Sequence, residues 1–154
     1  MKRRTDGIEG RASHLDLTAV KETVHAASPV DEIMTTLGVT QREIACWLHV
    51  TATTVGNFRS GKTARLREPA GLQLYLLRDL ASTMKEGLAP GRVPDLFRHS
   101  KVPDLGNATL LDALNRGEDV EFLTDVVRLG TGLSPRTERG RRLMQGNHID
   151  CGEG

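Results

Sequence analysis

Residues 40–61, TQREIACWLHVTATTVGNFRSG, hold the pattern that decides the fold. Thr40 and Glu43 stand three residues apart, just before a run of apolar residues, as in a capping box at the start of a helix. The spacing therefore predicts a helix over residues 41–48. A turn of three residues follows, and a second helix is predicted over residues 52–60.

Two helices that cross steeply over so short a turn need a small residue at their contact and apolar residues in the angle between them. Ala45 supplies the small residue, and Thr51 stands where the second helix needs its N-cap. The apolar residues are Ile44, Leu48, Val50, Val55 and Phe58. We interpret the segment as a helix-turn-helix, a motif whose second helix enters the major groove of DNA.

Polar and basic side chains of this segment are the candidate DNA contacts. Thr53, Thr54 and Asn57 are expected to face base edges, because hydroxyl and amide groups can read them. From residue 41 to residue 67 five cations stand against one anion, a balance that suits phosphates. The predicted set is Thr51, Thr53, Thr54, Asn57, Arg59, Ser60, Lys62 and Arg65.

A different class of protein is suggested by residues 56–63, GNFRSGKT, which satisfy the phosphate-binding pattern G-x-x-x-x-G-K-[ST]. A P-loop fold needs several buried parallel strands, whereas the rest of the chain offers helical periods. Pro69 and Gly71 also interrupt the helix that Lys62 would have to start. A P-loop nucleotide-binding protein is therefore the less favoured alternative.

The composition favours helices and gives no sign of a membrane span. Of the 154 residues 38% are hydrophobic and 27% charged, and aromatic residues at 3% are too few for an aromatic-rich β-sandwich. No stretch approaches the roughly 20 apolar residues of a membrane span. Two cysteines are too few for a disulfide framework. We expect an all-α, cytoplasmic protein.

Catalytic and metal-binding patterns are weak. His148 and Cys151 have the spacing of a ligand pair, but no further donors follow at a ligand spacing. No serine or cysteine stands in a recognisable nucleophile pattern. We therefore expect neither an enzyme nor a cofactor or metal.

Helix signals divide the chain into five parts. Ser28 and Pro29 begin a helix that Gly38 ends. The longest apolar run, over residues 68–86, predicts a helix with an apolar face too wide for one neighbour, and after Gly130 the periodicity is lost. Further helices are expected over residues 15–24, 110–116 and 120–129. The expected parts are a disordered basic arm (1–13), a helix-turn-helix domain (14–67), a connecting and dimerisation helix (68–87), a second helical domain (88–132) and a flexible tail (133–154).

The second helical domain differs from the first in charge. From residue 101 to residue 125 six anions stand against two cations. The two domains are therefore expected to meet different partners.

Residues 105–117, LGNATLLDALNRG, complete a family resemblance. With the helix-turn-helix and the long helix, they make residues 30–130 similar to the Xre/MbcA/ParS-like antitoxins, whose C-terminal domain carries an L-G-x-x-(P)-L-D-x-L-x-x-G core. The resemblance implies an Xre/Cro-like bundle joined by a long helix to a small helical domain. His49 stands where such repressors usually have glycine, which predicts a slightly different turn.

The resemblance implies the antitoxin of a type II toxin–antitoxin system, which neutralises a RES-type toxin and represses its own operon. A single helix-turn-helix reads only a short half-site, so a homodimer on a palindromic DNA operator is expected. The predicted toxin contacts are Phe97, Leu105, Leu110, Asp112, Arg139 and Arg142, and the tail would become ordered against a cleft of the toxin. A plain phage or chromosomal repressor without a toxin partner is the alternative.

Overall fold

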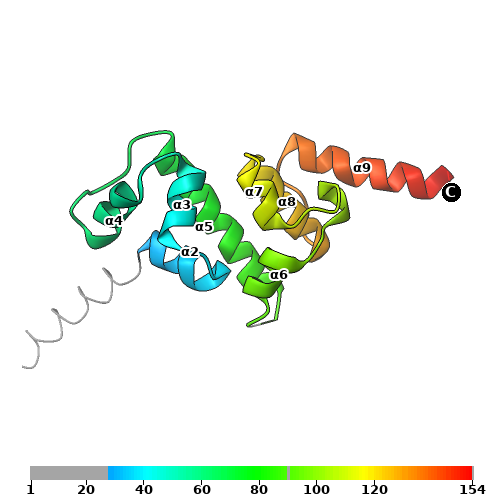
Figure 1. The fold of residues 1–154 in the computed structure, drawn as a ribbon. Coiled ribbons are helices and arrows are strands. Elements are labelled where there is room, and N and C mark those ends of the chain that lie inside the picture. The colour runs from blue at the N-terminus through cyan, green and yellow to red at the C-terminus, as the bar shows by residue number, and fades with distance from the viewer. Residues whose placement is uncertain (1–27, 90, 154) are drawn as a thin grey trace, which may run out of the picture.

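The computed structural model describes residues 28–89 and 91–153 (Figure 1). This part of the chain contains eight α-helices, one short 3-10 helix and no β-strand, so the predicted all-α class is confirmed. Within these residues no helix is both long enough and apolar enough to cross a membrane. The helix expected over residues 15–24 and the arm expected over residues 1–13 lie outside the described residues.

Three short helices form what we call the N-terminal unit. They are α2 (Pro29–Leu37), α3 (Gln41–Leu48) and α4 (Ala52–Ser60). The hydroxyls of Ser28, Thr40 and Thr51 cap them by accepting hydrogen bonds from backbone N–H groups of the first turns. Glu43 completes the capping box of α3 by accepting a hydrogen bond from the Thr40 N–H at 2.9 Å. The helices predicted over residues 41–48 and 52–60 agree with α3 and α4.

The connection between α3 and α4 depends on the conformation of His49. Its φ of 60° and ψ of 40° are left-handed, a region that glycine enters freely and other residues enter at a cost of about 1 kcal/mol. The imidazole is exposed, so no burial offsets this cost. The predicted difference in the turn is therefore wrong: His49 adopts the left-handed conformation that a glycine would take, and does so at the cost of strain.

The contact between α3 and α4 is apolar, as the sequence predicts. Ala45 and Val55 are buried, as are Ile44 and Leu48, while Val50 and Phe58 are partly buried against them. Trp47 is also buried, with 5% of its surface exposed, and the ring of Phe97 meets it edge-on at 6.0 Å between centroids. The α3–α4 corner is thus part of the main core.

The long helix α5 (Ala70–Gly87) runs between the two halves of the molecule (Figure 1). It packs against α2 and α3 on one side and against α8 on the other. Its buried residues include Leu74, Leu77, Leu80 and Met84. Leu72 and Tyr75 belong to the same apolar run but are 57% and 65% exposed, because the two neighbours cover only part of the apolar face.

The C-terminal unit consists of the helices that follow α5. They are α6 (Val93–His99), the 3-10 helix η1 (Pro103–Leu105), α7 (Leu110–Asn115) and α8 (Val120–Gly130). Thr109 caps α7, its hydroxyl accepting the Asp112 N–H at 3.0 Å. Phe97 and Leu123 are fully buried in the core of this unit.

The last helix, α9 (Glu138–Glu153), corrects the prediction of a tail without regular structure. It begins beside α8 and extends away from the body, at the end of the molecule opposite α4 (Figure 1). Gly140 is buried against Asp125, where a Cβ would collide with the carboxylate, so glycine is required at this contact.

Candidate nucleic-acid interface

The outer face of α4 carries three of the predicted DNA contacts. Val55 is fully buried and fixes the rotation of the helix. Thr53, Asn57 and Ser60 are spaced by four and three residues and so share the opposite side, with Thr53 and Ser60 exposed and Asn57 partly exposed. This row of hydroxyl and amide groups is a surface that could read base edges.

Thr51 and Thr54, also predicted as DNA contacts, are engaged within the helix. The Thr51 Oγ1 accepts the Thr54 N–H at 3.1 Å, and the two hydroxyls lie 2.8 Å apart in a hydrogen bond. A threonine that caps a helix has its oxygen directed at the backbone. The Thr51 side chain therefore caps α4, and the Thr54 hydroxyl is bonded to it. In the row of Thr53, Asn57 and Ser60, the Ser60 hydroxyl donates to the Asn57 carbonyl at 3.3 Å.

Arg59, predicted as a base or phosphate contact, is paired inside the N-terminal unit. Its Nε donates to the Asp31 Oδ1 at 2.6 Å and its Nη1 donates to the Gln41 Oε1 at 3.2 Å. Gln41 in turn donates from its Nε2 to the Ala52 carbonyl at 3.0 Å. Neither Asp31 nor Gln41 was predicted, because they lie 28 and 18 residues from Arg59.

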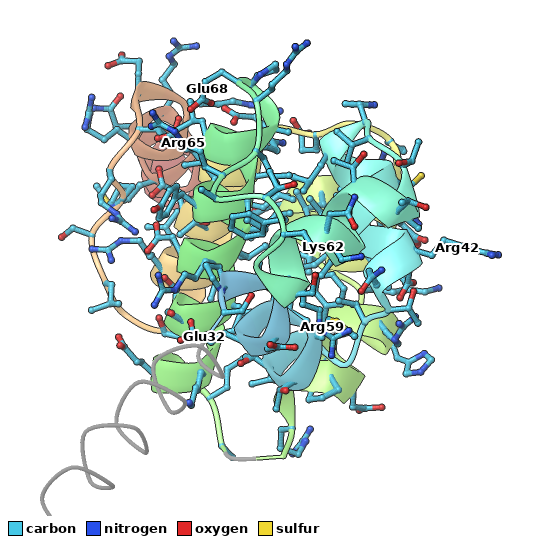
Figure 2. The ribbon with its side chains drawn as sticks, turned by 90° about the vertical axis from the view of Figure 1, so that its left-hand side faces the viewer. Glu32, Arg42, Arg59, Lys62, Arg65 and Glu68 are labelled. Atoms are coloured by element: carbon cyan, nitrogen blue, oxygen red, sulfur yellow. The ribbon has the colours of Figure 1, made fainter. Side chains whose placement is uncertain are left out.

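Basic residues also line the segment from α4 to α5. Lys62, Arg65 and Arg67 are exposed, and Figure 2 shows Lys62 and Arg65 along this segment. The segment is tied down by the Thr63 N–H, which donates to the Asn57 carbonyl at 3.1 Å, and by the buried Leu66. Lys62, Arg65 and Arg67 form no salt bridge with any residue that the structure describes.

Arg42 is a candidate contact that the sequence prediction counted as charge but did not place in the site. It is the second residue of α3, and its exposed side chain projects away from the body (Figure 2). The hydrogen bond from Gln41 to Ala52 brings the first turns of α3 and α4 together, so Arg42 stands beside the start of α4. Its place in the first turn of the helix that precedes α4 was the available signal.

Glu43, the one anion of residues 41–67, is paired with an arginine of the C-terminal unit. Arg98 of α6 donates from Nη2 to the Glu43 Oε1 at 2.8 Å and to the Gly38 carbonyl at 2.9 Å. Burial alone would raise the pKa of Glu43, but the Thr40 N–H and Arg98 outweigh it and hold this pKa below its ordinary value. The surface around α4 therefore keeps the positive balance that the sequence predicts.

Gly56, the first glycine of the phosphate-binding pattern, has a packing role within α4. It lies inside α4, and a Cβ there would stand 3.0 Å from the Gln41 Nε2. Lys62 follows the end of α4, whereas the pattern needs it at the start of a helix after a strand. The described residues contain no strand, so the geometry does not form a P-loop.

Three of the six predicted toxin contacts are not on the surface. Phe97, Leu105 and Leu110 are 0%, 6% and 4% exposed, and they fill the core of the C-terminal unit. Asp112 is exposed on α7 as a contact would require. The apolar residues were predicted from the family core, and a buried core is what that pattern encodes here.

The two predicted arginines of the tail lie on α9. Arg139 donates to both carboxylate oxygens of Glu118 at 2.7 and 3.2 Å, and its guanidinium stands 3.8 Å above the ring of Phe122. This hydrogen bonding is the main reason why the pKa of Glu118 is lowered. Arg142 is exposed and lies 3.7 Å from Glu138 of its own helix. Only Arg142 and Asp112 thus remain open to a partner.

Asp125 fastens the start of α9 to α8. Its side chain, in a residue that is 1% exposed, accepts the N–H groups of Arg136 at 2.8 Å and Thr137 at 2.7 Å, and the Thr137 hydroxyl at 2.5 Å. Burial would raise the pKa of Asp125, but these hydrogen bonds hold it below its ordinary value. Two of the six anions counted in the second domain, Glu118 and Asp125, are therefore satisfied by the chain's own C-terminal segment.

A shallow apolar groove of about 210 Å³ crosses the C-terminal unit. It lies between the end of α5, α6 and α8, and its lining includes Leu88, Leu96, Val102 and Val126. The helices that line it lie toward the end of α5 that is far from α4 (Figure 1).

Comparisons of the chain with protein-family models, with curated proteins and with solved structures found no match.

Proposed function

We propose that the chain is a sequence-specific DNA-binding regulator that reads the major groove with α4. The single observation that carries this proposal is the row of Thr53, Asn57 and Ser60 on the outer face of a short helix that follows a tight corner. Docking of a second helix after such a corner is the usual geometry of helix-turn-helix recognition. Asn57 is the side chain of the row that can form two hydrogen bonds with one adenine.

The charges around α4 support the same proposal. Arg42 lies beside the start of the helix, and Lys62 and Arg65 follow its end. Phosphate contacts on both sides of a reading helix fix its register on the duplex. One copy reads a short half-site, so we propose a homodimer on a palindromic operator with half-sites about 10 base pairs apart.

DNA binding is tested with a duplex selected from a random pool by the wild-type protein. Asn57→Ala should lower discrimination at one base pair about tenfold or more, without changing the salt dependence of binding. Lys62→Met should weaken binding to all sequences and reduce the slope of log K against log salt by about 1. Failure of the wild-type protein to select any sequence would contradict sequence-specific DNA binding.

We further propose that the regulator is the antitoxin of a type II toxin–antitoxin system and binds a RES-type toxin through its C-terminal unit. The resemblance of residues 30–130 to Xre/MbcA/ParS-like antitoxins supports this, as does the separation of the apolar groove from α4. A repressor without a toxin partner is the alternative. Co-purification with the product of the adjacent gene, and rescue of growth on co-expression, distinguish the two.

A further inference from the structure

We propose that Arg59 is a positioning residue for α4 rather than a phosphate contact. Asp31 and Gln41 accept its hydrogen bonds and take part in the same positioning. This inference rests on the proposed DNA-binding function. Arg59 lies in the last turn of α4, Asp31 in the first turn of α2 and Gln41 at the first position of α3. The three side chains therefore connect all the helices of the N-terminal unit.

The donors of Arg59 are directed inward along this connection. Its Nε lies 2.6 Å from the Asp31 Oδ1 and its Nη1 lies 3.2 Å from the Gln41 Oε1. Asp31 is suited to its place without Arg59, because a carboxylate in the first turn of a helix interacts favourably with the helix dipole. These two bonds use two of the five N–H donors of Arg59 and fix the orientation of its guanidinium.

Gln41 links Arg59, in the last turn of α4, to the first residue of the same helix. Its Nε2 donates to the carbonyl of Ala52, the first residue of the helix, at 3.0 Å. The same amide lies over Gly56, where a Cβ would approach the Nε2 to 3.0 Å. Glycine at this position leaves the room that the amide occupies. The first and last turns of α4 are thus held by one pair of side chains, and Thr53, Asn57 and Ser60 are presented between them.

The role is tested by Asp31→Asn and Arg59→Met, with Lys62→Met as the control that should remove a phosphate contact. If Arg59 positions α4, both variants weaken binding to the selected duplex about threefold or more, and neither changes the salt slope. If Arg59 contacts a phosphate, Arg59→Met lowers the slope by about 1, and Asp31→Asn strengthens binding, because an anion is lost and the guanidinium is released. The two roles thus predict opposite signs for Asp31→Asn, and the second outcome would overturn the proposal.

A second measurement does not depend on DNA. Amide hydrogen exchange of the free protein should be faster across residues 52–60 in Asp31→Asn and Arg59→Met, and unchanged in Lys62→Met. Unchanged exchange of α4 in the first two variants would overturn the positioning role. If the wild-type protein selects no duplex, the proposed function fails, while the exchange measurement still decides whether these side chains hold α4.

Discussion

The indole Nε1 of Trp47 donates a hydrogen bond to the Oδ1 of Asn115 at 2.8 Å. Trp47 belongs to α3 and Asn115 is the last residue of α7, so this bond joins the N-terminal unit directly to the C-terminal unit. Trp47 is the one tryptophan of the chain, and its fluorescence therefore reports on the contact between the units.

Loss of this bond should destabilise the protein modestly. Asn115→Ala leaves the indole N–H of a buried ring without its acceptor, at a cost of about 1 kcal/mol, since Asn115 is exposed and water can replace part of the bond. Asn115→Asp keeps an acceptor oxygen and is the matched control. Urea unfolding followed by Trp47 emission measures both, and equal losses in the two variants would contradict the assignment.

Replacement of His49 tests the strain of the α3–α4 turn. His49→Gly should change the free energy of unfolding by about +1 kcal/mol or less, because relief of the left-handed strain is partly offset by the greater freedom of glycine in the unfolded chain. His49→Val should lower the free energy of unfolding by more than about 1 kcal/mol, because β-branched residues tolerate a φ near 60° poorly. A valine variant as stable as wild type would show that the turn relaxes.

Asp125 controls the attachment of α9. Asp125→Ala removes the acceptor for three donors of Arg136 and Thr137, so the segment should detach and become accessible to protease. Trypsin should then cleave after Arg139 and Arg142 much faster than in wild type. Glu121→Gln, an exposed change on the same helix, is the control. Equal cleavage of the alanine variant and the control would show that other contacts hold α9.

The stability of the protein should depend on pH below about pH 5. The pKa values of Glu43, Glu118 and Asp125 are all lowered in the folded chain. Such groups stabilise the fold above their unfolded pKa values of about 4, and this contribution is lost as pH falls through the lower folded values. Urea unfolding should therefore give a constant free energy from about pH 7 to pH 5 and a smaller one at pH 3. Asp125→Asn should reduce that dependence, and a variant with the full wild-type dependence would contradict its share.

Local signals made the α3–α4 corner predictable from the sequence. Thr40, Glu43 and Thr51 act on backbone groups within three residues of themselves, so their spacing alone specifies where α3 and α4 begin. The buried role of Ala45 and Val55 follows from helical periodicity for the same reason.

Contacts between distant residues were not predictable in this way. The pairing of Arg59 with Asp31 and the capping of the α9 segment by Asp125 depend on tertiary packing, and no short pattern encodes either. Arg59 was therefore predicted as a DNA contact, and the packing of Gly140 against Asp125 was not predicted. The exposure of Leu72 does not follow from the sequence, because periodicity gives the width of an apolar face but not how much of that face the neighbours cover.

The position of α5 sets a limit on how the chain can be divided. Its Leu74 and Leu77 belong to the same continuous core as Ile33 of α2 and Leu123 of α8, so the two halves share one interior. A fragment that stops before Ala70 would lack α5, the helix against which α2 packs. Any transplant of the α3–α4 corner into another protein must carry this helix with it, and the whole described chain should melt as one cooperative body.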